Sequence, residues 1–469
     1  MNYHHYFRRA ERPVEACIVG TGGFGRSFVS QSRRVPLMNL RVAVDPTAEA
    51  AVDAYLAAGI ERQRIAVCDT AEQAAAAWAR GDVIAAGDLA TVVALPFDIV
   101  VEATGQPEAG AGHALMAIEH GRHLAIVTKE LDSVAGPGLA RMAAERGLVV
   151  TPVDGDQPSL LIGLVTWAEV LGLEILAAGK SSEYDFVFDP ATSTITVNGV
   201  SREVPGFAAL WEIGEAEPRA VFAARRERLG MFGQRAVPDL CEMGVVANST
   251  GLMPDVPPFH APVARITEVV EVFHAASSGG LLGGERRLDI FNCLREPDEV
   301  SFAGGVFVTV RCRDRETWDM IEEKGHIVSQ SGDVAFLFLP RHLLGLEAPI
   351  TILDAVVNGA SSGAAEPRPV LDLVARANTE LAAGTRLRCY GHHHVIDGLD
   401  PELVPAAPLS DDAPVPFYLA ANKRLRRTVS AGEVLRLGDL DGGDGSDGGG
   451  PSTLHRLRQR QDEMFFGDR

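Results

Sequence analysis

The sequence predicts an α/β protein. Its first part forms a doubly wound parallel sheet, which an α+β domain and a small β-rich domain follow. An apolar stretch, Ala16–Val19, runs directly into a group of glycines. Apolar strand patterns then alternate with helix patterns as far as Pro152, as in consecutive βαβ units. Beyond residue 155 this alternation stops, and a Pro-rich break at 364–369 precedes a third region.

The composition limits the classes of partner. The chain has 469 residues, enough for two or three domains. Its net charge of −20 argues against nucleic acid or an anionic membrane as a partner and leaves a small-molecule substrate. The six cysteines form no Cys-x-x-Cys pair, and the N-terminus has no apolar signal segment. We therefore expect a cytoplasmic protein with reduced thiols.

The glycine group has the spacing Gly-x-Gly-x-x-Gly directly after the first apolar stretch. In such a loop the first glycine allows a tight turn, the second lets the backbone approach a pyrophosphate, and the third lets the next helix pack closely on the strand. The loop residues expected to contact a cofactor are Gly20, Gly22, Gly23, Phe24 and Gly25. They predict a Rossmann dinucleotide-binding domain over residues 1–155, with NAD or NADP as its cofactor.

Two further strand ends fit this domain. Asp45 lies 20 residues after the last glycine of the loop, where an acid accepts hydrogen bonds from a ribose; a helix cap is the alternative. No arginine follows Asp45 closely, which favours NAD mildly. The continuous apolar strand 98–104 ends in Ala103, Thr104 and Gly105, beside the expected nicotinamide. Residues 47–97 are longer than one crossover helix needs and predict an insertion.

Two lysines stand at strand ends that face the expected cleft. Lys129 follows a strand of the first domain, and Lys180 ends the first strand of the α+β domain, which we assign to residues 156–363. A nicotinamide enzyme needs an acid or base and a group that holds the carbonyl oxygen. A desolvated lysine can have its pKa lowered towards neutrality, which suits proton transfer. We therefore expect both lysines to be catalytic, Lys180 in proton transfer or in orienting the substrate. For Lys129, an exposed strand-end lysine is the alternative.

Several polar residues of the second domain complete the predicted site. We expect Asp156 and Glu242 to be catalytic, and Glu183, Asn248 and Thr250 to bind substrate. Helix caps or surface positions are the competing interpretations of these residues. A divalent cation bound beside Lys180 stays an open alternative. No His-x-x-x-His or paired-carboxylate spacing in the sequence favours it. In the run His392–His394 only the first and third side chains would share a strand face.

These motifs together resemble the homoserine-dehydrogenase-like oxidoreductases that carry a C-terminal SAF domain, a group that includes the DXR-like reductoisomerases. The resemblance spans most of the chain. The residues that carry it are Gly20–Gly25, Ala103–Gly105, Gly155–Ser159, Ala178–Lys180, Glu242-Met243, Ala247–Leu252 and Leu344–Pro349. Residues 364–440 resemble the two halves of an SAF β-clip domain, and 441–469 are expected to form a flexible acidic linker and a short helical tail. The resemblance implies a homo-oligomer.

We therefore predict an NAD(P)-dependent oxidoreductase for a small polyhydroxylated or phosphorylated ketone, aldehyde or acid. Coupling of hydride transfer to a skeletal rearrangement, as in a reductoisomerase, stays open. A first alternative is homoserine dehydrogenase, because Lys129 resembles the lysine of those enzymes. A second alternative, of another class, is a sensor that binds cofactor and a sugar-like ligand without turnover.

Overall fold

Seven parallel strands form the sheet of the first domain. The structure is a computed structural model and describes residues 1–214, 217–441 and 451–467. The strands are β1 (Val14–Val19), β2 (Met38–Val44), β3 (Ile65–Cys68), β4 (Val83–Ala86), β5 (Ile99–Glu102), β6 (His123–Ile126) and β7 (Val150–Pro152), in the spatial order β3-β4-β2-β1-β5-β6-β7. All neighbouring pairs run parallel. The strand order reverses at β1, which confirms the predicted doubly wound sheet.

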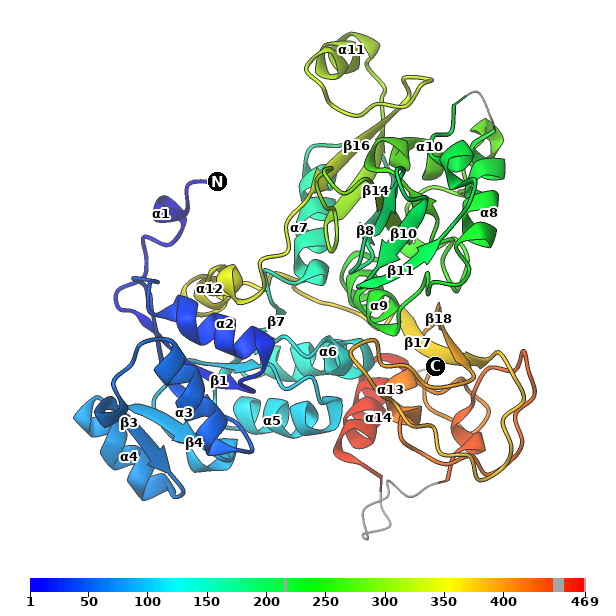
Figure 1. The fold of residues 1–469 in the computed structure, drawn as a ribbon. Coiled ribbons are helices and arrows are strands. Elements are labelled where there is room, and N and C mark those ends of the chain that lie inside the picture. The colour runs from blue at the N-terminus through cyan, green and yellow to red at the C-terminus, as the bar shows by residue number, and fades with distance from the viewer. Residues whose placement is uncertain (215–216, 442–450, 468–469) are drawn as a thin grey trace.

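Helices connect these strands and cover the sheet (Figure 1). They are α2 (Gly23–Ser32), α3 (Ala48–Ala57), α4 (Ala71–Arg80), α5 (Pro107–Glu119) and α6 (Lys129–Ala144), and a short α1 (Tyr3–Tyr6) precedes them. Local sequence sets their ends. The Thr70 hydroxyl caps α4 by accepting from the Gln73 amide, and Gly81 ends that helix with a φ of +79°. The segment 47–97 lies within the sheet, because it supplies β3 and β4 as two further parallel strands.

A mixed sheet forms the second domain. Its main strands are β8 (Ile175–Ser181), β9 (Phe186–Asp189), β10 (Thr194–Val197), β11 (Val200–Glu203), β14 (Arg287–Arg295), β15 (Val306–Arg311) and β16 (Val334–Leu339), in the order β11-β10-β9-β14-β8-β15-β16. Two short strands, β12 (Met253–Pro254) and β13 (Val263–Ala264), pair with β14. The helices are α7 (Gln157–Val170), α8 (Pro218–Arg228), α9 (Val237–Thr250), α10 (Val269–Val272), α11 (Arg315–Glu323) and α12 (Ala348–Leu353). This confirms the predicted α+β domain.

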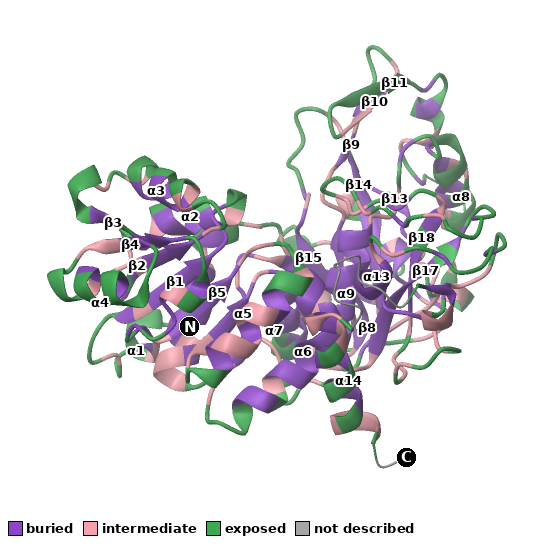
Figure 2. Cartoon of the chain, turned by 90° about the horizontal axis from the view of Figure 1, so that it is seen from below, coloured by how far each residue is buried: buried purple, intermediate pink, exposed green. Residues whose placement is uncertain are grey.

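Helices at the junction of the two domains are buried on nearly all sides. Every residue of α9 from Val237 to Asn248 is buried, and much of α6 and α7 is buried as well (Figure 2). Helix α9 packs against both α6 and α7, so it belongs to the cores of both domains. A helix buried all round carries apolar residues on every face. Any charged residue on α9 must therefore find partners inside the protein.

The region after residue 364 is a small β-rich unit. Strands β17 (Leu371–Ala377) and β18 (Leu399–Pro405) form an antiparallel pair. Isolated bridges, such as Leu381 with Val429 and Arg386 with Arg424, link the two halves of the unit. A single turn of helix, α13 (Phe417–Ala420), lies between them. The small β-rich domain is thus confirmed, and α9 contacts both β17 and β18.

The last helix returns to the first domain. Helix α14 (Thr453–Phe466), the predicted helical tail, packs on α5 and α6 (Figure 1). Its Arg458 is fully buried and donates to both carboxylate oxygens of Asp372 on β17, at 2.6 and 2.9 Å. Arg458 also donates to Asp462 at 2.8 Å. The linker predicted around 441–450 lies, except for residue 441, outside the described residues. No helix within the described ranges is long and apolar enough to span a membrane.

The buried ion pair of α14 allows a stability prediction. Replacing Arg458 by Ala leaves the buried carboxylates of Asp372 and Asp462 without their cation, so we expect the free energy of unfolding to fall by about 3 to 5 kcal/mol. Chemical denaturation followed by circular dichroism measures this. Arg460→Ala changes an exposed arginine of the same helix and should alter stability by less than about 0.5 kcal/mol. Equal losses in the two variants would contradict the prediction.

Candidate active site

The glycine loop has the geometry that a dinucleotide requires. Gly20 has a φ of +98°, and a Cβ atom there would lie 2.5 Å from the carbonyl oxygen of Ala103. A Cβ atom on Gly25 would lie 2.1 Å from the carbonyl oxygen of Gly20. Gly22 and Gly23 are exposed and have nothing within 4 Å of a Cβ position, so the loop is open where a pyrophosphate would approach. These residues fit NAD or NADP.

Asp45 lies beside this loop at the end of β2. Its Oδ2 atom accepts from the Thr21 amide at 3.0 Å and from the Thr21 hydroxyl at 2.8 Å. Its Oδ1 atom accepts from the Thr47 amide at 3.3 Å. Asp45 therefore buttresses the glycine loop, and it remains only partly buried. Because each carboxylate oxygen can accept more than one hydrogen bond, this position still suits a ribose hydroxyl.

The carboxyl ends of β5 and β6 are tied together next to the loop. Gly105, whose φ is +65°, donates its amide hydrogen to the Thr128 hydroxyl at 3.0 Å. The Thr104 hydroxyl donates to the buried carboxylate of Glu102 at 2.6 Å. Thr128 in turn precedes Lys129, the first residue of α6. This places Lys129 at the edge of the sheet where doubly wound folds bind their ligands.

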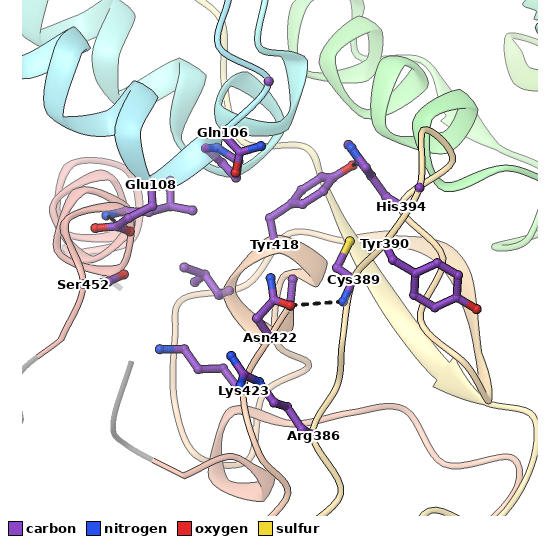
Figure 3. Close-up of a pocket in the computed structure, with 16 residues that line it drawn as sticks. Gln106, Glu108, Arg386, Cys389, Tyr390, His394, Tyr418, Asn422, Lys423 and Ser452 are labelled. Atoms are coloured by element: carbon purple, nitrogen blue, oxygen red, sulfur yellow. Dashed lines mark hydrogen bonds between the residues drawn. The ribbon is translucent and has the colours of Figure 1, made fainter. Parts of the chain in front are cut away.

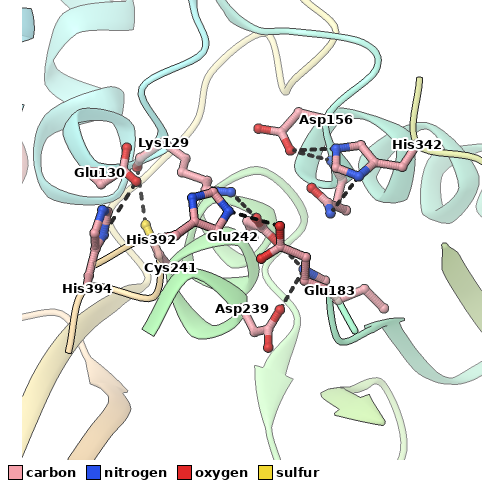
Figure 4. Close-up of polar contacts among 12 residues, drawn as sticks. Lys129, Glu130, Asp156, Glu183, Asp239, Cys241, Glu242, His342, His392 and His394 are labelled. Atoms are coloured by element: carbon pink, nitrogen blue, oxygen red, sulfur yellow. Dashed lines mark hydrogen bonds and ion pairs between the residues drawn. The ribbon is translucent and has the colours of Figure 1, made fainter. Parts of the chain in front are cut away.

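Both predicted catalytic lysines meet at one carboxylate. Lys129 from the first domain and Lys180 from β8 each donate to Glu242, one to each carboxylate oxygen. Lys180 also donates to Asp239 at 2.7 Å, one turn earlier on α9. Lys180, Asp239 and Glu242 are almost completely buried, whereas the Lys129 side chain is 22% exposed. We call Lys129, Lys180, Asp239 and Glu242 the lysine cluster (Figure 4).

The charges of the cluster correct one expectation. Burial alone would lower the pKa of each lysine, but the surrounding carboxylates outweigh burial and raise both pKa values above the usual range. For Lys129 these are Asp156, Glu242 and Glu130, and for Lys180 they are Asp239 and Glu242. The expected lowering towards neutrality is thus wrong. Both lysines are ammonium ions at neutral pH and act as donors of positive charge and hydrogen bonds.

Asp156 lies on the other side of Lys129, as the N-cap of α7. Its carboxylate accepts from the Gln157 amide at 3.0 Å and lies 3.6 Å from Nε2 of His342. Burial acts to raise the pKa of Asp156, but Lys129 and His342 hold it well below the usual range. Asp156 is therefore an anion that helps to keep Lys129 protonated.

The pKa of Glu130, next to Lys129, is raised, whereas that of Asp156 is lowered. Burial raises the pKa of the Glu130 carboxyl group to about 7, despite the attraction of Lys129. Nδ1 of His394, from the C-terminal unit, lies 3.6 Å from its Oε1 atom and 2.9 Å from the Tyr418 hydroxyl. Burial and the charge of Lys129 lower the pKa of His394 to about 4, so its imidazole is neutral. Glu130 is a buried acid that titrates near neutral pH, as a proton-exchanging group must.

A hairpin of the C-terminal unit closes one side of the site. Tyr390 and Val395 pair across its tip, which carries the run His392–His394. His392 lies 2.9 Å from Oε1 of Glu183, and His393 lies 3.7 Å from its Oε2. Glu183 follows β8, so the hairpin contacts carboxylates of both large domains: Glu130 in the first and Glu183 in the second (Figure 4). We call residues 390–395 the histidine hairpin.

Two predicted substrate residues serve the fold instead. The side-chain oxygen of Asn248 accepts from the amides of Val370 and Leu371, at 2.8 and 3.3 Å, and so fixes the start of β17 on α9. The Thr250 hydroxyl donates to the Val246 carbonyl at 2.8 Å, within the last turn of α9. We therefore leave both residues out of the site. Among the described residues, no group of three or more His, Cys, Asp and Glu side chains is arranged to hold a metal ion.

The structure adds three residues that the sequence analysis did not single out: Asp239, Glu130 and His342. It also brings the run His392–His394, noted in the sequence, to the site. A signal was present for Asp239, because it lies three residues before Glu242 and so shares its helix face. Glu130 follows Lys129 directly, but only its burial reveals a role. No local signal shows where His342 or the histidine run would lie, because their partners Gln157 and Glu183 are 185 and 209 positions away.

A second, partly buried acid gives a pH prediction. Asp132 lines the same small cavity as Lys129 and Asp156, and burial raises its pKa to about 7. Between its usual pKa and 7 the unfolded chain loses this proton while the folded protein keeps it, so stability falls as pH rises. Between pH 5 and pH 8, the free energy of unfolding of Asp132→Asn should rise by about 2 to 3 kcal/mol relative to that of the original protein.

Urea denaturation at the two pH values measures this difference. Asp53→Asn, which changes an exposed aspartate on α3, is the matched control and should show no gain between pH 5 and pH 8. A stability difference for Asp132→Asn that is the same at both pH values would contradict the raised pKa.

One family comparison bears on the second domain. Residues 236–348 match the family model for the catalytic domain of oxidoreductase DRL. The matched segment begins at α9 and so includes Asp239 and Glu242 of the lysine cluster, as well as His342. The match confirms the predicted enzyme class, an oxidoreductase. No curated protein sequence matches the chain.

Solved structures resemble the chain only weakly. GenD2 from gentamicin A biosynthesis, in complex with NAD, is 16% identical over 74% of this chain and 87% of its own, with a TM-score of 0.31. An oxidoreductase from Agrobacterium radiobacter, in complex with NAD+, L-tartaric acid and magnesium, is 16% identical over 46% of this chain and 55% of its own, with a TM-score of 0.27. A DOX-P reductoisomerase with fosmidomycin and magnesium is 18% identical over 36% of this chain and 46% of its own, with a TM-score of 0.27. The match thus spans about half the length of the latter two proteins.

Proposed function

We propose that the protein is an NAD(P)-dependent oxidoreductase that interconverts a hydroxyl and a carbonyl group on a small polyhydroxylated or phosphorylated molecule. One observation supports this most strongly. Two of the four lysines of the chain, from different domains, share the carboxylate of Glu242 at the strand ends beside an open glycine loop. A sensor that only binds a cofactor has no need of paired, buried ammonium ions at this place.

The cofactor would lie along the glycine loop, with Gly22 and Gly23 facing its pyrophosphate and Asp45 its ribose. When bound, it supplies or accepts the hydride. Ala103, Thr104 and Gly105 continue the same edge of the sheet towards Lys129. The substrate would then lie between this edge and the lysine cluster, under the histidine hairpin.

Lys129 is the residue best placed to contact the reacting oxygen. It is the more exposed of the two lysines, and its ammonium can turn from Glu242 towards a substrate oxygen. Its positive charge stabilises the negative charge that grows on a carbonyl oxygen as the carbonyl is reduced, and its proton can pass to that oxygen. Lys180 is enclosed and has two carboxylate partners, so it positions Glu242 and does not touch substrate.

Glu130 and Asp156 divide the acid–base work around Lys129. Asp156 stays ionised and keeps Lys129 charged, while Glu130, with a pKa of about 7, can return a proton to Lys129 after Lys129 has given one to the substrate oxygen. Glu183 lies on the second domain within reach of the hairpin, where it suits a substrate hydroxyl. Coupling to a rearrangement, homoserine dehydrogenase activity, the SAF identity of the C-terminal unit, a homo-oligomer and a cytoplasmic location remain predictions.

Cofactor binding and turnover test the proposed function. Titration of the protein with NADH and with NADPH, followed by fluorescence, should reveal saturable binding. Absorbance at 340 nm is then followed with C4–C5 polyols, ketoses, aldonates, their phosphates and homoserine, with and without Mg²⁺. Cofactor binding without any turnover would favour the sensor, and oxidation of homoserine alone would favour homoserine dehydrogenase.

Lys129→Met should abolish most turnover without abolishing cofactor binding. Loss of one charged donor to the developing oxyanion costs about 10²- to 10³-fold in kcat. Lys324→Met, which changes an exposed lysine after α11, is the matched control and should leave kcat unchanged. Glu242→Gln keeps the shape of the cluster and should lower kcat as well. Turnover that survives in Lys129→Met would overturn the assignment.

Glu130→Gln should change the pH profile of the reaction. Because Gln cannot ionise, the ionisation near pH 7 should disappear from the profile of kcat against pH, while NADH affinity stays unchanged. Steady-state rates between pH 5.5 and 9 measure this. A profile that keeps its inflection near pH 7 in the variant would assign that ionisation to another group.

A further inference from the structure

A cavity outside the lysine cluster lies between the first domain and the C-terminal unit. Its volume is about 640 Å³, within the range of about 300 to 1,000 Å³ typical of small-molecule sites. One wall is formed by Gly105, Gln106 and the start of α5. The facing wall comes from the C-terminal unit, including Arg386, Asn422 and Lys423 (Figure 3). No residue of the lysine cluster lines this space; the cavity shares Gly105 with the proposed cofactor edge and borders the histidine hairpin.

The facing wall carries the cationic side chain of Arg386, although the chain as a whole carries −20. Lys423 lines the same wall, and Glu108 lies on the wall opposite. Both oxygens of Glu108 already accept hydrogen bonds, from the amides of Thr453 at 2.6 Å and Leu454 at 3.1 Å. The carboxylate therefore caps the N-terminus of α14, and its charge is offset by that of the helix end.

Arg386 is the strongest single indication of a ligand. Its exposed guanidinium makes no hydrogen bond or ion pair with any of the described residues, unlike the nearby Arg376 and Arg427, which pair with carboxylates. A guanidinium presents a planar fork that fits the oxygens of a phosphate group. Asn422 stands beside it; its side-chain oxygen accepts from the Cys389 amide at 3.2 Å, and its side-chain NH2 group can donate to a ligand.

We infer that this cavity binds a small phosphorylated molecule, with its phosphate on Arg386, as an effector separate from the reacting substrate. The charge and size of the cavity fit such a ligand. The N-terminus of α5 adds positive potential on the opposite wall. The inference does not depend on the proposed reaction, because no residue of the lysine cluster lines the cavity.

The histidine hairpin connects the cavity to the lysine cluster. Tyr390, Gly391 and His394 line the cavity, while His392 and His394 contact Glu183 and Glu130 on the other side. A ligand that packs against the cavity side of the hairpin therefore holds it in the position in which it covers the site. Binding in the cavity should then be coupled to the position of Glu130, whose charge acts on Lys129.

Cys389 provides a reporter of this binding. It lines the cavity and is partly exposed, whereas the other five cysteines are buried. Burial raises the pKa of its thiol to about 11, so alkylation by iodoacetamide is slow and can be followed at pH 8.5 by mass spectrometry of the full-length protein. Inorganic phosphate, glycerol 3-phosphate and NAD+ are compared as probes at constant ionic strength.

We expect glycerol 3-phosphate to slow alkylation of Cys389 at least fivefold, in a saturable manner. Arg386→Ala should abolish this protection, while Arg388→Ala, which changes an exposed arginine outside the cavity lining, should keep it. Thermal melting of both variants checks that they fold. Protection by NAD+ alone would assign the cavity to the cofactor and overturn the inference.

The remaining outcomes also test whether the cavity binds a phosphorylated molecule. Equal protection by inorganic phosphate and glycerol 3-phosphate supports a phosphate site, and saturating NAD+ that leaves this protection intact supports its independence from the cofactor. No protection by any probe, or equal protection in folded Arg386→Ala, would overturn the inference. Because the readout is alkylation, a failure here is distinct from an absence of turnover.

Discussion

The carboxylate of Glu242 is the contact on which the arrangement of the site depends. It accepts from an ammonium of each large domain, and all three charged groups lie inside the protein or at its edge. Desolvating such charges is costly, and the cost is recovered only when every charge has its partners in place. Lys180 therefore requires Asp239 and Glu242, these require α9 to sit against β8, and α9 in turn fixes where α6 presents Lys129.

Segments from the second half of the chain stabilise the same arrangement from outside. Gly345 packs so closely on α2 that a Cβ atom there would lie 2.6 Å from the Phe28 amide nitrogen. This contact brings residues 341–347 back to the helix that follows the glycine loop, and His342 to Asp156. Helix α14 does the same on α5 and α6, through Arg458 and Gln461. The cofactor loop, the lysine cluster and the histidine hairpin are thus parts of one packed unit.

The features of the fold and site that neighbouring residues determine could be predicted from the sequence. The glycine spacing, the continuous apolar strands and the lysines at strand ends identified the doubly wound sheet and both lysines of the cluster. Protonation could not be predicted in this way, because the pKa of Lys129 depends on the carboxylates of Asp156 and Glu242, which only the folded chain brings near it. The same holds for Asn248: its sequence neighbours suggest a polar site, but the distant amides of Val370 and Leu371 occupy it.

In the proposed reaction, the charge balance of the cluster accounts for the way in which a resting ammonium can still assist. Lys129 and Lys180 carry two positive charges, and Asp156, Asp239 and Glu242 offer three carboxylates. A neutral carbonyl oxygen competes poorly with Glu242 for the Lys129 proton. An oxygen that gains negative charge as the carbonyl is reduced competes well, so the hydrogen bond strengthens only as the reaction proceeds. An interaction that is stronger in the transition state than in the ground state is what accelerates a chemical step. Binding Lys129 firmly to Glu242 beforehand therefore favours turnover over tight binding of substrate.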